Sequence, residues 1–203
     1  LNIEKMMSNK NKSIQVLTKG VEFLLKKNKV HYIKGKGVIF SKNDIVVYEN
    51  NKRTNYKSKN IVIATGSEVV SLPGVKIDEK NIISSTGALS LSKVPKKLAV
   101  IGGGYIGLEM GSVWSRLGSE VTVIEYLDYI TPGMDREISN EFQKILTKQG
   151  IKFKMGSKVN SIKNNVNSVS INFTNVKNSK EENLVFDKVL VSVGRKPYTE
   201  GLN

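Results

Sequence analysis

The six residues GGGYIG at positions 102–107 constrain the fold of this chain more than any other part of its sequence. An apolar run typical of a strand precedes them at 98–101, and a second predicted strand follows at 121–125 and ends in an acid. The residues between, 105 to about 117, have the pattern of a helix that ends at Gly118. A G-x-G-x-x-G sequence by itself is a weak indicator, but between a strand and a helix it is typical of a dinucleotide-binding βαβ unit. The alternative is a glycine-rich turn in an α/β protein that binds no nucleotide.

Each glycine of this motif has a physical role in such a unit. Gly102 permits the tight turn out of the strand, Gly104 lets the backbone approach a pyrophosphate, and Gly107 lets the helix pack closely on the strand. The pyrophosphate then lies at the helix N-terminus, where unpaired N–H groups and the positive end of the helix dipole favour an anion. Glu109 follows in the first turns, and either it only stabilises the helix dipole or it lies near the nicotinamide.

Glu125 closes the second strand, 23 residues after Gly102. A carboxylate at this spacing is suited to accept hydrogen bonds from the adenosine ribose hydroxyls of NAD. A 2′-phosphate would meet a like charge there, and the next residues, Tyr126 and Leu127, supply no arginine to offset it. The sequence therefore predicts a site for NAD rather than NADP.

The rest of the chain predicts an α/β fold with a parallel sheet, because strands alternate with helices. Before the motif we expect a helix at 4–27, short strands at 31–33 and 45–48, a hairpin loop at 50–55, a buried strand at 61–64 and a turn or short helix at 84–91. After it we expect a helix that begins at Asp135 and ends at Gly150, a strand at 151–155, a β-meander over 159–186 and a buried strand at 188–193.

Composition narrows the classes of function. The formal net charge is +14, but the lysines are scattered among asparagines rather than clustered, so we expect solvated surfaces and no nucleic-acid partner. The chain has no cysteine and one histidine, His31, which argues against a thiolate nucleophile or a zinc site. No apolar run approaches the ~20 residues that span a bilayer, and we expect no membrane association.

Three segments occur in an order that resembles the FAD-dependent pyridine nucleotide-disulfide oxidoreductases: IVIATGS at 61–67, the motif at 102–107 and DKVLVSVGRKP at 187–197. In finer detail, KMM at 5–7, SSTGALSL at 84–91, GSVW at 111–114 and GRKPYT at 194–199 are similar to the branch that oxidises dihydrolipoamide. The resemblance implies a Rossmann-like dinucleotide-binding domain, with a parallel sheet and a β-meander, plus part of an FAD-binding domain. The expected division is 1–83 in the FAD domain, 84–193 in the NAD domain, and 194–203 returning to the FAD domain.

The resemblance also implies roles for individual residues. The resemblance implies that the residues at the FAD site are Gly37, Thr65, Gly66 and Ser67. At the NAD it places Gly102, Gly103, Gly104, Tyr105, Ile106, Gly107, Leu108, Glu109, Glu125, Val159 and Gly194. Many relatives have alanine at the position of Gly103, which needs only a small residue.

The activity implied is electron transfer from dihydrolipoamide, through a cysteine pair and FAD, to NAD. The resemblance further implies a homodimer, a dihydrolipoamide-bearing acyltransferase subunit of a 2-oxo acid dehydrogenase complex as partner, and a mitochondrion or another organelle as the compartment. The family's cysteine pair and its His–Glu acid/base pair have no counterpart here, so we expect a central fragment that carries no catalytic residue and does not turn over alone. The alternatives are another NAD-linked disulfide oxidoreductase or NADH oxidase, and a non-catalytic NAD-binding module.

Overall fold

The computed structural model describes residues 1–202, which divide into two compact units. Unit 1 comprises Val69–Arg195 with the first three residues, and unit 2 comprises Glu4–Glu68 with the described residues from Lys196 onward. Among the described residues, every buried apolar side chain except Val46 belongs to unit 1. Unit 1 therefore contains the main hydrophobic core.

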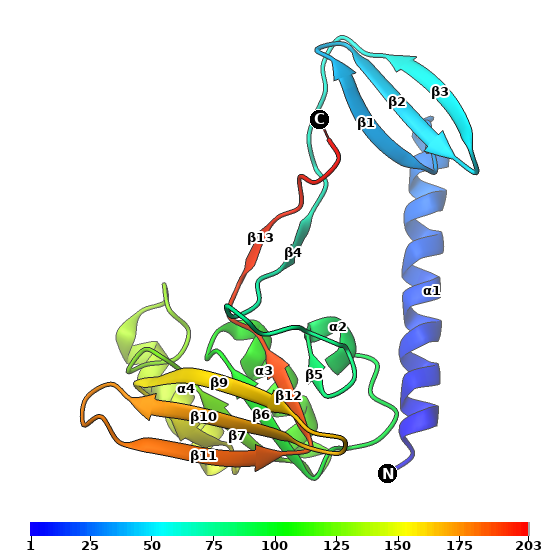
Figure 1. Cartoon of the computed structure of the whole chain (residues 1–203). Coiled ribbons are helices and arrows are strands. Elements are labelled where there is room, and N and C mark those ends of the chain that lie inside the picture. The colour runs from blue at the N-terminus through cyan, green and yellow to red at the C-terminus, as the bar shows by residue number, and fades with distance from the viewer. Residues whose placement is uncertain (203) are drawn as a thin grey trace. The chain divides into compact units, whose positions relative to one another are not determined.

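A five-stranded parallel sheet forms the centre of unit 1 (Figure 1). Its strands lie in the order β5-β12-β6-β7-β8 and its helices are α2, α3 and α4. The bounds are β5 Ile82–Ile83, α2 Ser85–Ala88, β6 Lys97–Ile101, α3 Tyr105–Arg116, β7 Glu120–Ile124, α4 Arg136–Lys148, β8 Lys152–Lys154 and β12 Lys188–Val191. The expected Rossmann-like α/β arrangement is confirmed.

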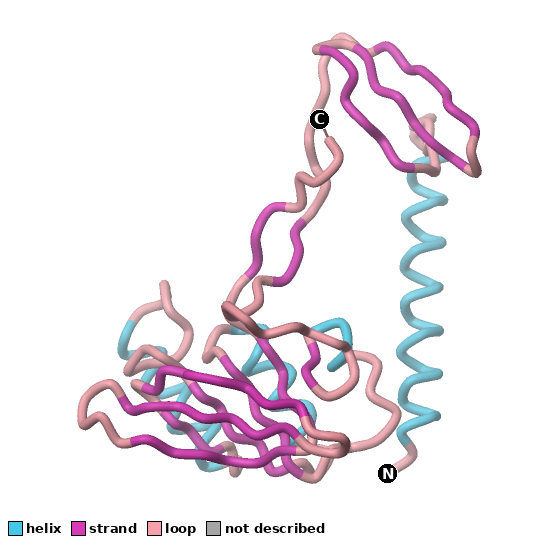
Figure 2. Tube along the Cα trace, viewed as in Figure 1, coloured by secondary structure: helices cyan, strands magenta, loops and turns pink. Residues whose placement is uncertain are grey.

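The two faces of this sheet pack against different elements, because side chains alternate along each strand. Ala99 and Ile101 of β6 pack with Ile171 and Phe173 of a three-stranded antiparallel meander, formed by β9 (Ser157–Asn164), β10 (Val169–Asn175) and β11 (Glu181–Phe186). Val100 instead points to α3 and contacts its glycines. Figures 1 and 2 show the meander on one side of the sheet and α3 on the other. The expected β-meander is thus confirmed as a cover for one face.

The helix ends follow the capping rules. The Asp135 carboxylate accepts hydrogen bonds from the backbone N–H groups of Glu137 and Ile138, which are unpaired donors of the first turn of α4. Gly118 and Gly150 follow α3 and α4 with φ values of 103° and 96°, a backbone conformation that glycine adopts without steric cost. These three residues explain why the helix boundaries were predictable.

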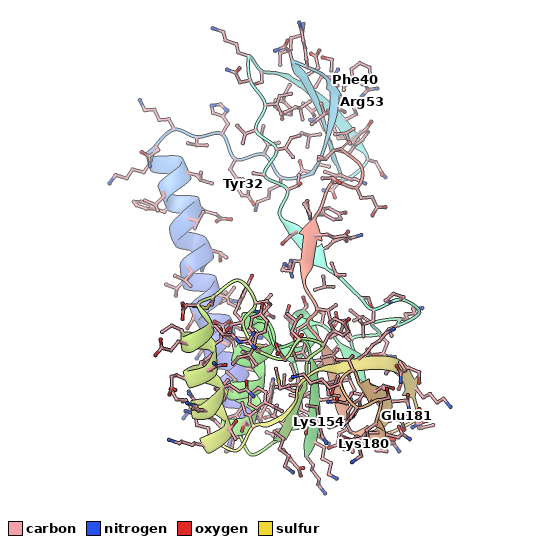
Figure 3. The ribbon with its side chains drawn as sticks, turned by 90° about the vertical axis from the view of Figure 1, so that its left-hand side faces the viewer. Tyr32, Phe40, Arg53, Lys154, Lys180 and Glu181 are labelled. Carbon is pink, nitrogen blue, oxygen red and sulfur yellow. The ribbon has the colours of Figure 1, made fainter. Side chains whose placement is uncertain are left out.

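Unit 2 contains α1 (Ile3–Lys27) apart from its first residue, and a three-stranded antiparallel sheet. Two short paired strands, β4 (Ser67–Val69) and β13 (Arg195–Pro197), cross the division between the units. The sheet consists of β1 (Lys36–Ser41), β2 (Asp44–Glu49) and β3 (Lys52–Lys57). The guanidinium of Arg53 lies 5.9 Å from the centre of the Phe40 ring on this sheet (Figure 3). Within residues 1–202, no helix has both the length and the apolarity needed to cross a bilayer.

Three expectations for unit 2 are wrong in detail. The hairpin loop is not 50–55 but the two residues Asn50 and Asn51, whose φ values of 45° and 66° form the tight turn that matches strand twist. Residues 31–33 form no strand. The segment 61–64 is not a buried strand, since Val62 is 87% exposed and no described strand pairs with it.

The loop before β5 is fixed by Asp78. One carboxylate oxygen accepts hydrogen bonds from the backbone N–H groups of Lys80, Asn81 and Ile82, at 2.8 to 2.9 Å. The other accepts from the Asn164 amide at the end of β9. Partial burial raises the pKa of Asp78, but these hydrogen bonds to the charged form outweigh it, and the pKa lies below its ordinary value.

This shift predicts a pH dependence of stability. Because the folded-state pKa is lowered, ionised Asp78 stabilises the fold above the pKa of the unfolded chain, and this contribution is lost as the pH falls through the folded-state pKa. The free energy of unfolding of the wild type should exceed that of Asp78→Asn at pH 7, and the gap should narrow below roughly pH 4. Urea unfolding at both pH values checks this, and an equal gap at both would contradict it.

Candidate functional site

A cleft of about 1190 Å³ opens at the carboxyl ends of β6, β7 and β12. Its position is the one that α/β sheets favour for ligands, because the chain proceeds from β6 to β7 and β8 on one side and returns to β12 on the other. The volume is above the ~300–1,000 Å³ of ordinary small-molecule sites. Among the residues expected at the cofactor, those that line it are Gly102, Gly104, Tyr105, Ile106, Glu125, Val159 and Gly194.

Two glycines of the motif have no room for a side chain: Gly102 in the turn after β6, and Gly107 near the start of α3. Gly102 has a φ of 104°, and a Cβ added there would overlap the carbonyl oxygen of Ser192. A Cβ on Gly107 would lie 2.5 Å from the carbonyl oxygen of Gly102 and equally close to Oγ of Ser192. The tight turn at Gly102 and the close packing of α3 on β6 at Gly107 agree with the sequence analysis. The close approach of Ser192, which follows β12, was not predicted.

Gly104 differs from the neighbouring glycines, because the space that a side chain would occupy there is open. It is the N-cap of α3 with an ordinary φ of −75°, and an added Cβ would have no atom within 4 Å. No side chain caps the helix at this end, so its first N–H groups remain available to a ligand in the cleft. An open helix N-terminus with a bare backbone fits the pyrophosphate of a dinucleotide.

Glu125 lies just beyond β7 and is only 8% exposed. One carboxylate oxygen accepts a hydrogen bond from the N–H of Gly103 at 2.5 Å, and the other accepts from the N–H of Leu127 at 2.7 Å. Two backbone donors thus hold the carboxylate in one orientation at the wall of the cleft. Each oxygen retains acceptor capacity for a ribose hydroxyl.

Other expected residues support the site rather than line it. Gly107 and Leu108 are buried beneath the cleft, and Gly103 is buried against Glu125. A Cβ on Gly103 would lie 3.2 Å from the Glu125 carboxylate, so even alanine requires a small adjustment. Glu109 is exposed on α3 and does not line the cleft.

The four residues expected at FAD all belong to unit 2. Gly37 lies in β1, and Ser67 begins β4. The hydroxyl of Thr65 donates to the Tyr198 carbonyl, and the Tyr198 N–H donates to the carbonyl of Gly66 at 3.0 Å. The segment 65–67 is therefore tied to the returning C-terminal segment. Their contact with FAD stays a prediction.

The sequence analysis missed the loop at 126–134, which forms one wall of the cleft. Its lining residues are Tyr126, Leu127, Thr131, Pro132 and Met134. The loop has no regular pattern, and its only sequence signal is its position directly after Glu125. Across the cleft, the hydroxyl of Ser192 donates to the Ile101 carbonyl at 2.9 Å and ties β12 to the glycine turn.

The outer side of this loop carries an exposed ion pair. The Arg136 guanidinium donates to Asp128 at 3.0 Å and lies 4.0 Å from the centre of the Tyr129 ring. The hydrogen bond from Arg136 lowers the pKa of Asp128 below its ordinary value. Because both partners are about half exposed, the pair orients the loop more than it stabilises the fold.

Comparison with known proteins places this site in a family. The family described as "Pyridine nucleotide-disulphide oxidoreductase" matches residues 2–203. The chain is 58% identical to dihydrolipoamide dehydrogenase of Chaetomium thermophilum, 53% identical to mitochondrial dihydrolipoyl dehydrogenase of Schizosaccharomyces pombe and 53% identical to dihydrolipoyl dehydrogenase 3 of Pseudomonas putida. Each match covers 100% of this chain and 40%, 40% and 44% of the relative.

Solved structures show the same likeness. The HOCl-induced flavoprotein disulfide reductase RclA from Escherichia coli superposes with a TM-score of 0.83 at 27% identity, over 100% of this chain and 45% of that one. A point mutant of the same reductase, solved as a Cu(II) complex, gives a TM-score of 0.84 at 28% identity, over 98% of this chain and 44% of that one. The chain thus spans less than half the length of the proteins that it matches.

Proposed function

The chain belongs to the pyridine nucleotide-disulphide oxidoreductase family, and we propose that its unit 1 is the NAD-binding domain of a dihydrolipoamide dehydrogenase. The observation that carries the proposal is the arrangement of Glu125 with the glycine turn. An oriented, nearly buried carboxylate lies in the cleft beside the open helix N-terminus at Gly104, because the neighbouring Gly103 donates to it. A dinucleotide offers a diol to the first and a pyrophosphate to the second.

NAD suits this cleft better than NADP for an electrostatic reason. The 2′-phosphate of NADP carries negative charge and would displace or face the Glu125 carboxylate. The Glu125 carboxylate accepts hydrogen bonds from two backbone amides, those of Gly103 and Leu127. The ribose hydroxyls of NAD can instead donate hydrogen bonds to the carboxylate.

In the intact enzyme, we propose that electrons pass from dihydrolipoamide through a cysteine pair and FAD to NAD. Bound NAD supplies the hydride-accepting chemistry, and the protein supplies binding and orientation. In this chain, the turn residues 102–107 hold the pyrophosphate, Glu125 holds the ribose, and Val159 and Gly194 flank the adenine and nicotinamide ends. Gly37 with the segment 65–67 contacts FAD. Glu109 lies outside the cleft, so of its two expected roles we assign it the stabilisation of the helix dipole.

The partners and compartment follow from the same proposal. The intact enzyme is a homodimer and receives electrons from the dihydrolipoamide-bearing acyltransferase subunit of a 2-oxo acid dehydrogenase complex. The compartment is a mitochondrion or another organelle. Support comes from the relatives named as mitochondrial in fission yeast and pea, whereas the Pseudomonas putida relative is bacterial.

Cofactor binding is tested by calorimetric titration of the 203-residue chain with NAD and with NADP. We expect NAD to bind and NADP to bind at least about tenfold more weakly, a difference of one charge-assisted hydrogen bond. A chain that is folded by circular dichroism but binds neither cofactor would rule the proposal out.

The electron donor is tested with the intact enzyme. Dihydrolipoamide should drive NAD reduction, and NADH alone should consume no oxygen. Rapid oxygen consumption with NADH and no reaction with dihydrolipoamide would instead favour an NADH oxidase of the same family.

A further inference from the structure

A chain of hydrogen bonds joins Glu125 to the loop at 126–134. The backbone of Gly103 is its centre: the N–H of Gly103 donates to Glu125, and the carbonyl of Gly103, in the next peptide group, accepts from the N–H of Thr131 at 2.8 Å. Ile130, fully buried, packs against the same glycine. The orientation of the Glu125 carboxylate therefore depends on where the loop places the backbone of Thr131.

The backbone of Thr131 has an unusual conformation at this position. Its φ is 51°, in the left-handed region, which a β-branched residue rarely adopts. Such a conformation persists only where surrounding contacts over-determine it, and it is concentrated at ligand-binding sites. Thr131 is 6% exposed and lines the cleft.

The contact that holds Thr131 comes from α4. Oγ1 of Thr131 and Oγ of Ser139 lie 2.8 Å apart, so that one hydroxyl donates to the other, and Ser139 is fully buried. The Thr131 carbonyl accepts from the N–H of Met134 at 3.1 Å and closes the turn. Because α4 is a regular helix capped at Asp135, Ser139 is a fixed anchor for the loop.

We propose that Thr131 is a positioning residue for the cofactor. Anchored by Ser139, it orients Glu125 through the backbone of Gly103 before the ribose arrives. The proposal rests on the NAD-binding function proposed above and adds a residue to it. Its physical basis is preorganisation: a carboxylate that is already oriented loses less conformational freedom on binding. The strain at Thr131 is the cost of that orientation.

The test compares Thr131→Gly with the wild-type 203-residue chain by calorimetric titration with NAD and with NADP. Glycine adopts a positive φ without strain, and this partly offsets the loss of the hydrogen bond to buried Ser139, so the variant should stay folded by circular dichroism while the loop is released. We expect the dissociation constant for NAD to rise roughly 3- to 10-fold, the effect of one neutral buried hydrogen bond. The constant for NADP, which gains nothing from Glu125, should change less, so discrimination falls.

Two further variants distinguish the positioning of Glu125 by Thr131 from a general increase in loop flexibility. Thr131→Ser keeps the hydroxyl and should bind NAD within about twofold of the wild type. Ser179→Gly relieves the same kind of strain, at a φ of 57° in the β10–β11 turn, and should leave both dissociation constants unchanged because Ser179 does not line the cleft.

The inference is overturned if Thr131→Gly keeps the wild-type affinity for NAD, if it weakens NAD and NADP equally, or if Thr131→Ser is as weak as Thr131→Gly. A wild-type chain that binds no NAD would contradict the proposed function itself, and this inference with it. The first three results leave wild-type NAD binding intact, so the two failures are distinguishable.

Discussion

Replacing Gly107 by alanine is expected to lower the free energy of unfolding of unit 1 by about 3 kcal/mol and to abolish NAD binding. The added Cβ would lie 2.5 Å from the Gly102 carbonyl oxygen and 2.9 Å from Val100 Cγ1. A backbone oxygen cannot rotate away as a side chain can, so α3 must move off the sheet and carry the pyrophosphate site with it. Urea unfolding followed by fluorescence measures this, because Trp114, the only tryptophan, is buried in unit 1.

Gly104→Ala is the matched control within the same turn. An alanine Cβ there meets no atom within 4 Å and the φ of −75° suits any residue, so stability should stay within about 0.5 kcal/mol of the wild type. Affinity for NAD should nevertheless fall, because the Cβ would occupy the place where the backbone meets the pyrophosphate. If the two variants proved equally stable, the close approach at Gly107 would be refuted.

Glu125→Ala is expected to weaken NAD binding roughly 10- to 100-fold, because hydrogen bonds to a charged group contribute about 1.5–3 kcal/mol. Affinity for NADP should hold or improve, since the like charge facing the 2′-phosphate is removed. The ratio of the two dissociation constants is therefore the sharpest readout. It separates recognition from stability, which also falls because the N–H groups of Gly103 and Leu127 lose their acceptor.

Glu120→Gln provides the control for Glu125. It is a glutamate at the opposite end of the same strand, exposed and paired with Lys152 at 2.5 Å. The ratio of NAD to NADP affinity should be unchanged in this variant, because the amino end of β7 is remote from the cleft. An unchanged ratio in Glu125→Ala as well would show that another group reads the ribose.

Much of unit 1 could be predicted because its signals are local. The glycines at 102, 104 and 107 have the G-x-G-x-x-G spacing within one short segment. Asp135 caps the helix that it precedes, and Glu125 directly follows the strand that it was predicted to close. Each of these sequence signals spans only a few residues, so the sequence alone indicates it, although the contacts that result, such as that of Glu125 with Gly103, join residues far apart in the chain. The roles of these residues in binding NAD stay predictions until the titrations above are made.

The features that escaped prediction depend on contacts distant in sequence. Nothing near Thr131 indicates a left-handed threonine, because the conformation is imposed by Gly103 and by Ser139 on α4. The apolar run at 61–64 reads as a buried strand, but a parallel strand becomes one only when neighbours pair with it. Ser192 shows its importance only where β12 meets the glycine turn, ninety residues earlier in the chain.

The two short strands β4 and β13 have an evolutionary consequence. The chain passes into unit 1 at Val69 and out of it at Arg195, and the N–H of Val70 donates to the carbonyl of Gly194 at 3.0 Å, so both crossings occur side by side. A segment whose ends meet can be inserted into a host protein, or exchanged for another, at a single point in the gene. Val69–Arg195 thus has the form of a segment that can be exchanged as one piece, and the nucleotide preference proposed for it would move with that piece.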